Sequence, residues 1–344
     1  MNPRQYRNII LGIAIVSIPL YFYFASRAKP TVKKSYSGIM NTLLRLEIVG
    51  RTETAQTDLD RLAAELEVLD KTLSRFNPES EISRINVHAG RMPVRVSDAT
   101  LRLVQLCQTI SFRTGGAFDA TVGPLVDLWQ IFPSSRIDDT LWKPPQKEAI
   151  NTARRLVGSN NIVLDQARAT VFLTKLGMSL DVGGIAKGFA LDMAAARLNS
   201  LGISNFLIEL GGDIYAGGRR ADGKPWKIGI LNPRMPTDII ASLEVSNMSV
   251  STSGDYESFR TYMGARFTHI FDPQNGSPAR GLAAVTILSP SATEADALST
   301  AAFVLGPEEG LKLIENWPNA DGVFIDTTMR VFTTTRLRGK VQLK

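Results

Sequence analysis

Cysteine and histidine are nearly absent from this chain of 344 residues, which contains one cysteine and two histidines. A single cysteine excludes an internal disulfide, and the apolar helical pattern around Cys107 predicts a buried thiol rather than a nucleophile. Neither His88 nor His269 has a second histidine or a cysteine at the spacing of zinc ligands. The scarcity of both residue types therefore argues against disulfide, cysteine-nucleophile and zinc chemistry.

The chain also lacks the charge pattern of a nucleic-acid-binding protein. Its formal net charge is +6, but lysine and arginine are scattered outside residues 27–34, and no basic stripe interleaved with aromatic residues occurs. A mild basic excess suits an anionic ligand equally well. Hydrophobic residues make up 44% of the chain and charged residues 21%, which is the composition of an ordinary globular protein. We therefore expect no nucleic-acid partner.

One long hydrophobic run is present, at residues 9–25, after two arginines. It is slightly shorter than the roughly 20 residues of a membrane span, and it lacks a small-x-small cleavage site. The aromatic residues at positions 21–24 suit the interface of a bilayer. We predict that residues 1–27 form an uncleaved membrane anchor, with a cleaved signal peptide as the alternative, and that residues 28–36 form a linker. More lysines and arginines follow the run than precede it, so charge alone does not place the body outside the membrane.

The remaining residues, 37–344, are predicted to form one α+β body. Apolar residues spaced by three and four positions predict helices at residues 54–76, 97–113, 146–157, 185–198 and 293–305. Short apolar runs between turn signals predict strands at residues 40–49, 162–164, 170–175, 178–182, 205–210, 227–232, 241–251, 268–271 and 282–288, and a hairpin at 323–332. Runs of strands with interspersed helices favour mixed β-sheets with packed helices over a doubly wound parallel sheet.

The most informative motif is Leu-Asp-Val-Gly-Gly-Ile-Ala-Lys-Gly at residues 180–188. Gly183 and Gly184 allow the backbone to approach a ligand closely, and the N-terminus of the following helix offers unpaired N–H groups to an anion. Lys187 lies in the first helical turn, where the helix dipole disfavours a cation, as it would in a phosphate site. The motif is neither a Walker A loop nor a Gly-x-Gly-x-x-Gly turn. A plain strand-to-helix turn is the alternative interpretation.

A second group of polar residues lies at the start of the helix predicted for residues 293–305. Ser291 and Glu294 match a capping box, which gives that acid a structural task and leaves Asp296 beyond the first turn. Asp296 and Thr300 are four residues apart and share a helix face, where their hard oxygen atoms suit Mg²⁺. The alternative is a solvated aspartate beside a threonine bonded to its own helix. The helix is apolar on nearly all sides, so an unpaired aspartate there would be costly.

Three further segments carry weaker signals. His269 lies in the strand predicted for residues 268–271; a histidine has an ordinary pKa near neutrality and can act as a general base, although a strand histidine is more often structural. The hydroxyl-rich turn at residues 251–256 can bind phosphate or ribose oxygens, or simply end a strand. Its Ser253 lacks the Gly-x-Ser-x-Gly surroundings of a hydrolase nucleophile. The glycine-rich segment 115–124 either lines a slot for a ring or forms a surface loop.

Taken in chain order, these segments resemble the ApbE family, the FAD:protein FMN transferases, from about residue 40 to residue 306. The blocks that carry the resemblance are residues 74–81, 115–124, 181–188, 210–213, 251–256, 269–273 and 296–306. The resemblance implies a single catalytic body with a T-fold-like α+β architecture. It also implies a Mg²⁺-dependent reaction that splits the pyrophosphate of FAD. FMN is transferred to a Thr or Ser hydroxyl of a target protein, and AMP leaves.

The resemblance also implies roles for individual residues of this chain. Asp296, Thr300 and the backbone carbonyl of Ala186 would bind Mg²⁺. The catalytic residues would be Asp296 and His269, and His269 would activate the incoming hydroxyl. The residues implied to contact FAD are Met40, Phe118, Asp119, Asp181, Gly183, Gly184, Lys187, Ser253, Gly254, Asp255 and His269. Such a set suits phosphoryl transfer, which needs positioning and charge neutralisation more than a strong protein nucleophile.

The resemblance further implies partners and a location. The targets would be flavin-bearing subunits of membrane redox complexes, such as Na⁺-pumping NADH:quinone reductase (Nqr), Rnf-type complexes and NosR-like proteins. Because the family is mostly extracytoplasmic, we expect an inner-membrane anchor with the catalytic domain in the periplasm or outside the cell.

Two departures from the family pattern stand out. Residues 40–42 read Met-Asn-Thr where the family commonly has Met-Gly-Thr, and the lipidated cysteine of many relatives is absent. Phe76 lies in a block where relatives differ between transfer to protein and hydrolysis of FAD. The alternative functions are therefore an FAD diphosphatase that releases FMN and AMP, and a non-catalytic membrane-tethered FAD-binding protein.

Overall fold

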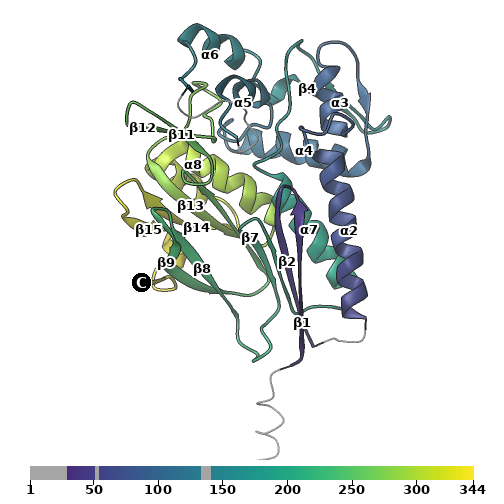
Figure 1. Cartoon of the computed structure of the whole chain (residues 1–344), viewed down its shortest axis with the longest axis vertical. Coiled ribbons are helices and arrows are strands. Elements are labelled where there is room, and N and C mark those ends of the chain that lie inside the picture. The colour runs from purple at the N-terminus through teal and green to yellow at the C-terminus, as the bar shows by residue number, and fades with distance from the viewer. Residues whose placement is uncertain (1–28, 51–53, 133–140) are drawn as a thin grey trace, which may run out of the picture.

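The computed structural model describes residues 29–50, 54–132 and 141–344 (Figure 1). The membrane anchor predicted for residues 1–27 lies outside the described residues. Within the described ranges, no helix combines the length and the hydropathy that crossing a bilayer requires.

An antiparallel sheet of eight strands forms the framework of the molecule. In spatial order its strands are β1 (Thr31–Ile39), β2 (Thr42–Val49), β6 (Phe206–Leu210), β7 (Asp213–Gly217), β10 (Met248–Gly254), β13 (Leu282–Ser289), β14 (Asp321–Asp326) and β15 (Val331–Thr333). Every ladder recorded among the described residues is antiparallel. The predicted α+β class is therefore confirmed, whereas the sheets are antiparallel and not mixed.

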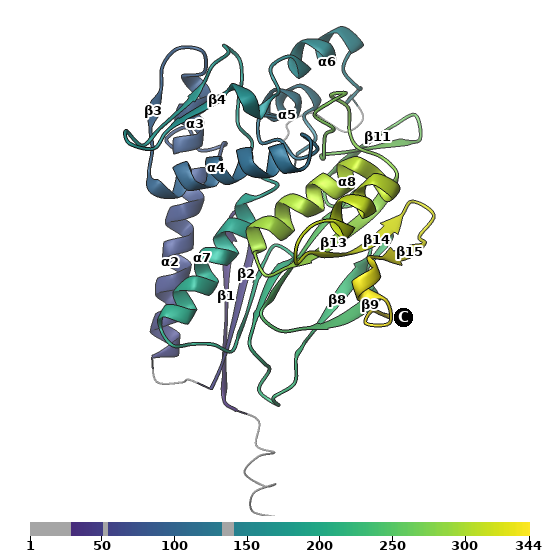
Figure 2. The same cartoon turned by 180° about the vertical axis from the view of Figure 1, so that it is seen from behind.

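Helices cover one face of this sheet, and a smaller sheet covers part of the other (Figures 1 and 2). The helices are α2 (Ala55–Leu73), α7 (Ala186–Ser200) and α8 (Ala292–Glu315), and the smaller sheet has the order β16 (Gln342–Leu343), β9 (Met235–Val245) and β8 (Trp226–Asn232). Trp226 and Leu243 of the smaller sheet share a buried cluster with Val250 of the large one. Burial on both faces explains why β13 is apolar along most of its length.

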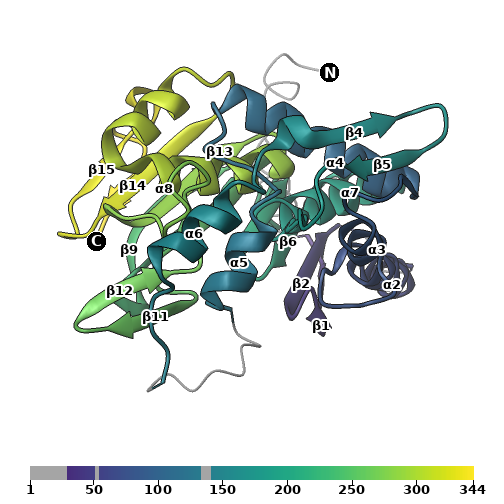
Figure 3. The same cartoon turned by 90° about the horizontal axis from the view of Figure 1, so that it is seen from above.

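The remaining elements gather at one end of the sheet, beyond the ends of α2 and α7 (Figures 1 and 3). They are α3 (Glu81–Val87), α4 (Asp98–Arg113), α5 (Gly123–Trp129), α6 (Lys147–Arg154), η1 (Ser159–Asn161), the small sheet of β3 (Val94–Arg95), β5 (Thr170–Leu173) and β4 (Ile162–Asp165), and the hairpin of β11 (Phe259–Tyr262) and β12 (Ala265–Thr268). A short helix, η2 (Thr335–Leu337), follows β15 in the chain. The end of the sheet that carries α5 and the β11–β12 hairpin positions the site described below.

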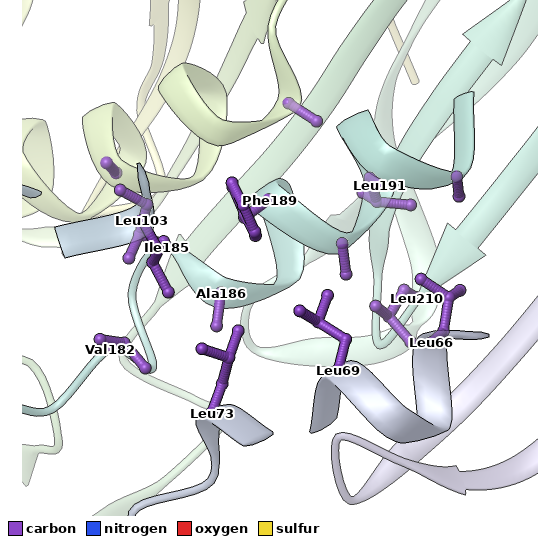
Figure 4. Packing of buried hydrophobic residues seen from close by; sticks show 14 of the residues in the cluster. Leu66, Leu69, Leu73, Leu103, Val182, Ile185, Ala186, Phe189, Leu191 and Leu210 are labelled. Carbon is purple, nitrogen blue, oxygen red and sulfur yellow. The ribbon is translucent and has the colours of Figure 1, made fainter. Parts of the chain in front are cut away.

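The packing of α7 decides where the glycine motif lies. Leu69 and Leu73 of α2 pack beside Ala186 on one side of α7, while Phe189 lies on the side towards α8 (Figure 4). At the crossing of α7 and α8, a Cβ added to Gly188 would lie 2.2 Å from the carbonyl oxygen of Ala292. Glycine is needed at this position because any side chain would push the two helices apart.

Several strand predictions need correction. The linker predicted for residues 28–36 is wrong from Thr31 onward, because β1 begins there. As an edge strand with a solvated face, β1 needs inward-facing apolar residues only at alternate positions, and Val32 and Tyr36 supply them. The strand predicted for residues 241–251 is two strands, β9 and β10, since Asn247 adopts a positive φ of 54° and reverses the chain.

Two further strand predictions are wrong because the chain there lines a site rather than a sheet. Residues 178–182 make only an isolated bridge between Ser179 and Val122, and β12 ends at Thr268, before residues 269–271. Near the chain end, α8 continues past residue 305 to Glu315, through a break at Gly306, where φ is 78°.

Candidate active site

A cavity of about 290 Å³ opens at the end of the large sheet, beside α5 and the start of the β11–β12 hairpin. It collects most of the residues that the sequence singles out, from segments far apart in the chain. These are Phe118, Asp119, Asp181, Gly183, Gly184, Lys187, Ser253, His269, Asp296 and Thr300. Met40 and Ala186 line an adjoining cavity of about 180 Å³, which shares Asp181, Gly183 and Lys187 with the first. The two cavities together therefore form one candidate site.

Asp296 is the most deeply placed acid of the site, with 3% of its surface exposed. Its Oδ2 accepts a hydrogen bond of 2.9 Å from the backbone N–H of Gly188, and its Oδ1 lies 3.7 Å from Nζ of Lys187. Burial raises the pKa of Asp296 to about 6, although Lys187 and Gly188 oppose the shift. The aspartate on the apolar helix is thus paired, not solvated.

Lys187 lies between two buried carboxylates. Its Nζ donates to Oδ2 of Asp213, and it is near Asp296 on the other side. Burial alone would lower the pKa of Lys187, but the two carboxylates outweigh it and raise the pKa above its usual value. Sequence reasoning included Asp213 in a family block but missed this pairing. The only sequence signal for it is the Gly-Gly-Asp turn that follows β6.

Thr300 lies one helical turn beyond Asp296 and also faces the cavity. Its Oγ1 is 3.5 Å from Oγ of Ser253, which in turn lies 2.7 Å from Oγ of Ser299. A Cβ added to Gly184 would come within 2.9 Å of Thr300 Oγ1. The glycine therefore lets the backbone before α7 approach the hydroxyl closely, as the glycine pair predicts.

His269 is held at the base of the β11–β12 hairpin. Its Nδ1 lies 3.0 Å from the carbonyl oxygen of Ser258, which also accepts from the backbone N–H of His269 at 3.1 Å. A carbonyl oxygen can only accept, so in the neutral ring Nδ1 carries the proton and Nε2 has the free lone pair. Burial lowers the pKa of His269 below its usual value, and nearby Lys187 acts in the same direction, whereas the Ser258 bond opposes them. The neutral, base-competent form is therefore favoured at neutral pH.

Glu257 also lines the cavity, and sequence reasoning missed it. Desolvation by the cavity walls raises the pKa of Glu257 to about 7; Lys187 opposes the shift, and the acids Asp213 and Asp296 add to it. It follows directly on the hydroxyl-rich turn, so proximity in the sequence is the only signal that could have found it.

Asp181 is fixed by a bridge of charges at the boundary of the two cavities. It accepts hydrogen bonds of 2.8 Å from Nη1 of Arg75 and 2.8 Å from the backbone N–H of Gly183. Arg75, whose side chain is 10% exposed, also contacts Asp127 of α5 at 2.6 Å. Next to it, Phe76 is 54% exposed, with its ring centroid 5.7 Å from that of Phe132. Both rings line the large cavity.

Three residues implied to contact FAD are held by contacts within the protein. The carboxylate of Asp119 accepts from the backbone N–H groups of Thr121 and Ser159, at 2.8 and 2.9 Å, so it holds its own loop together. Asp255 lines neither cavity. Its two carboxylate oxygens accept hydrogen bonds of 2.6 and 2.8 Å from the guanidinium group of Arg234. Gly254 also lies outside both cavity walls, and a Cβ there would clash with the ring of Tyr256 at 2.3 Å. Asp119 therefore braces its own loop while lining the large cavity, whereas Asp255 and Gly254 lie outside both cavity walls.

The Met-Asn-Thr departure has a backbone explanation. Met40 and Asn41 form the two-residue turn between β1 and β2, with positive φ angles of 50° and 56°. This is the left-handed conformation of a type I′ turn, which favours Gly and Asn. The backbone N–H of Met40 donates to Oδ2 of Asp70 at 2.8 Å, which fixes the turn against α2. Asparagine can therefore replace glycine here without moving Met40.

The N-terminus of α8 confirms half of the predicted capping box. Oγ of Ser291 accepts from the backbone N–H of Glu294 at 3.2 Å, whereas the Glu294 side chain pairs with Arg113 at 3.3 Å. Asp192 of α7 takes over the remaining caps, since it accepts from the backbone N–H groups of Ala292 and Thr293 at 2.7 and 2.9 Å. These bonds tie α7 to α8 and thereby fix Asp296 relative to the glycine motif.

The predicted buried state of Cys107 is confirmed, and burial raises the pKa of its thiol well above the usual value. Over residues 29–50, 54–132 and 141–344, no group of three or more His, Cys, Asp or Glu side chains is arranged to hold a metal ion. The ligand set implied for Mg²⁺ has a single carboxylate, with one hydroxyl and one carbonyl oxygen. This all-oxygen set suits a cation that retains water ligands, and Asp296 and Thr300 do line one cavity.

Comparison with known proteins finds relatives that match most of the chain. The profile of the ApbE family matches residues 40–324. The FAD:protein FMN transferase of Vibrio cholerae is 33% identical over 309 residues, which cover 88% of this chain and 90% of that protein. The ApbE protein of Thermotoga maritima superposes with a TM-score of 0.82 at 30% identity, covering 90% of this chain and 99% of the other. The flavin transferase ApbE of Vibrio cholerae gives a TM-score of 0.79 at 29% identity, with the same coverage.

An antiparallel α+β body holds a cavity lined by an acid, a lysine and a hydroxyl where two helices cross. Together with the relatives above, it defines the class of the flavin transferases. The chain belongs to the ApbE family.

Proposed function

We propose that this protein transfers FMN from FAD to a serine or threonine hydroxyl of a target protein and releases AMP. The observation that carries the proposal is the convergence of Lys187, His269, Asp296 and Thr300 in one cavity of an ApbE-family fold. Relatives about 30% identical over most of this chain bear the name FAD:protein FMN transferase.

The proposed reaction is one displacement at phosphorus. The hydroxyl oxygen of the target attacks the phosphorus on the FMN side of the pyrophosphate, and the bond from that phosphorus to the bridging oxygen breaks. AMP leaves with the bridging oxygen. The hydroxyl proton passes to Nε2 of His269, which is free to accept it because Nδ1 is bound to Ser258. Lys187 supplies positive charge to the phosphates, at the N-terminus of α7, where backbone N–H groups add to it.

Magnesium is the proposed cofactor, held by Asp296, Thr300 and the backbone carbonyl of Ala186. When bound, Mg²⁺ would neutralise charge on the pyrophosphate oxygens and on the leaving phosphate. Two observations support this ligand set. The backbone at Gly184 approaches the Thr300 hydroxyl closely, and the Asp296 carboxylate is buried, so both residues offer oxygen atoms of the kind that Mg²⁺ binds.

The decisive experiment incubates the full-length protein with FAD, Mg²⁺ and a candidate acceptor subunit. Covalent flavin is read as fluorescence on the acceptor after denaturing electrophoresis, and AMP and free FMN are measured beside it. We expect fluorescent acceptor and AMP in equal amounts, and neither product when EDTA replaces Mg²⁺. Release of AMP with free FMN and no labelled acceptor would instead identify an FAD diphosphatase. Bound FAD with neither product would identify a binding protein.

We further propose that residues 1–27 anchor the protein in the inner membrane, with the catalytic body in the periplasm or outside the cell. The aromatic-rich hydrophobic run at residues 9–25 supports an anchor. The proposed targets are subunits of membrane redox complexes of the Nqr, Rnf or NosR type. The test is fractionation of cells, followed by protease treatment of intact spheroplasts. Loss of the full-length band without lysis is expected, and a protected band would contradict the external location.

A further inference from the structure

Lys187 has two carboxylate neighbours of different kinds. Asp296 lines the large cavity, whereas Asp213 does not line either cavity and reaches the ammonium from the side of the sheet. Both acids are buried, with exposed fractions of 3% and 1%. The ammonium hydrogen-bonds to Asp213 but stays 3.7 Å from Oδ1 of Asp296. The lysine is thus drawn towards the acid that no ligand in the cavity can reach.

The position of Asp213 is set by the backbone. It is the first residue of β7 and pairs with Leu210 of β6 across a two-glycine turn. Gly211 and Gly212 adopt positive φ angles of 59° and 92°, which most side chains avoid. Oδ1 of Asp213 accepts from the backbone N–H of Thr252 in β10 at 3.2 Å, so its other oxygen is left for Lys187.

We propose that Asp213 is a positioning residue that holds the Lys187 ammonium off Asp296, so that the Asp296 carboxylate stays open to a divalent cation. The inference rests on the proposed function, because it requires a cation at Asp296. With both acids ionised, the group of Asp213, Lys187 and Asp296 carries a net negative charge, which attracts a divalent cation. Without the charge of Asp213, Lys187 has Asp296 as its nearest partner and competes with the cation for it.

The proposal is tested by substituting Asp213 and Lys187 separately, because the two substitutions should change the affinity for a divalent cation in opposite directions. In the absence of FAD, we expect Asp213→Asn to weaken the affinity for Mn²⁺ by about tenfold, through the lost charge and the competing lysine. Lys187→Met should strengthen the same affinity, since it removes the competitor and its positive charge. The double variant should bind Mn²⁺ more tightly than Asp213→Asn alone.

The measurement is Mn²⁺ binding to the full-length protein, by calorimetry and by the electron paramagnetic resonance of free Mn²⁺. Thermal unfolding is recorded for each variant beside it. Asp326→Asn is the matched control, because Asp326 is also a buried aspartate that binds its own turn, at the far strand β14. It should leave the affinity for Mn²⁺ unchanged. An Asp213→Asn protein that folds and binds Mn²⁺ as the wild type does would overturn the proposal.

The outcomes also separate this inference from the proposed function. If Asp296→Asn abolishes Mn²⁺ binding while Asp213→Asn and Lys187→Met leave it unchanged, the metal site stands and the positioning role of Asp213 fails. If the wild-type protein binds no Mn²⁺ with or without FAD, the metal site and the positioning role fail together. Should Asp213→Asn not fold, the sign of the Lys187→Met effect decides, since weaker binding there contradicts competition by the lysine.

Discussion

At the scale of single residues, Asp296 is both a buried charge and a hydrogen-bond acceptor for the backbone of α7. Its Oδ2 accepts from the backbone N–H of Gly188 at 2.9 Å. Asparagine can keep this acceptor and lose only the charge, whereas alanine would also leave a buried N–H unpaired, at a cost of about 1–3 kcal/mol. The two substitutions therefore distinguish a structural from a catalytic contribution.

We expect Asp296→Asn to retain the fold and to lower FMN transfer by about 10²–10³-fold, the size of effect found for a lost electrostatic contact in a transition state. Transfer is measured as acceptor fluorescence, and the fold is checked by thermal unfolding. Asp296→Ala should lose both activity and stability. An asparagine variant with more than about a tenth of the wild-type rate would show that the charge is not needed for the chemistry.

His269 gives a prediction about pH. Burial lowers its pKa below the usual value, and the base must be neutral to accept a proton. The value of kcat/KM should therefore rise with pH through that lowered pKa, so that the midpoint of the rise lies below pH of about 6.5, the ordinary histidine value. His269→Gln should lower the rate by about 10²–10⁴-fold and remove this limb from the pH profile. A slow variant that keeps the same limb would mean that another group is the base.

At the scale of elements, the crossing of α7 and α8 sets the distance between the glycine motif and Asp296. A Cβ at Gly188 would meet the backbone of Ala292 at 2.2 Å and Cβ of Asp296 at 2.8 Å. Because the nearest atom belongs to the backbone, the clash cannot be relieved by a side-chain rotation. The site therefore depends on this helix contact as directly as on its polar residues.

We expect Gly188→Ala to lower the free energy of unfolding by about 1–3 kcal/mol, the usual cost of overpacking. It should also weaken Mn²⁺ binding, since Asp296 moves with the helix. Urea unfolding and Mn²⁺ calorimetry measure the two effects. Ala196→Ser, at an exposed position of the same helix, is the control and should change neither. Full stability and metal affinity in Gly188→Ala would contradict the close contact.

The sequence predicts the bounds of a helix or strand well where a local signal, such as a cap or a regular hydrophobic spacing, marks them. The cap at Ser97 and the hydrophobic spacing in α2 are local, and both were found within a few residues of their observed bounds. β1 was missed because an edge strand with polar residues on its solvated face has the composition of a linker. The division between β9 and β10 depends on the positive φ of Asn247, for which a single asparagine is too weak a signal.

At the scale of the whole molecule, the site is assembled from segments that the sequence does not place side by side. The resemblance to a family predicts that Lys187, His269 and Asp296 share one site, and all three line the same cavity. The partners that hold them were not predicted, because the bond between Lys187 and Asp213 arises from packing α7 across the ends of β6 and β7. Residues that support other residues leave no motif of their own.

Because helices, the large sheet and the segments that flank the β11–β12 hairpin all contribute walls to one cavity, ligands that bind there should stabilise the whole described body. A ligand that binds only the folded state adds about 2.7 kcal/mol at a free concentration 100 times its Kd. We expect FAD to raise the unfolding temperature of the full-length protein, and to raise it further when Mg²⁺ is present, since phosphate and cation share Lys187 and Asp296. Scanning calorimetry with FAD, with Mg²⁺ and with both measures the two effects.

The part of the stabilisation that needs both ligands is the informative quantity. In Asp296→Asn, FAD alone should still stabilise the protein, because Phe118 and Asp181 still line the cavity. Mg²⁺ should add no further stabilisation. Reciprocity requires that FAD strengthen Mg²⁺ binding by the same factor as Mg²⁺ strengthens FAD binding. If FAD stabilises the wild-type protein equally with Mg²⁺ and with EDTA, the cation does not bind beside the pyrophosphate in this cavity. Asp296 and Thr300 would then not be ligands of Mg²⁺.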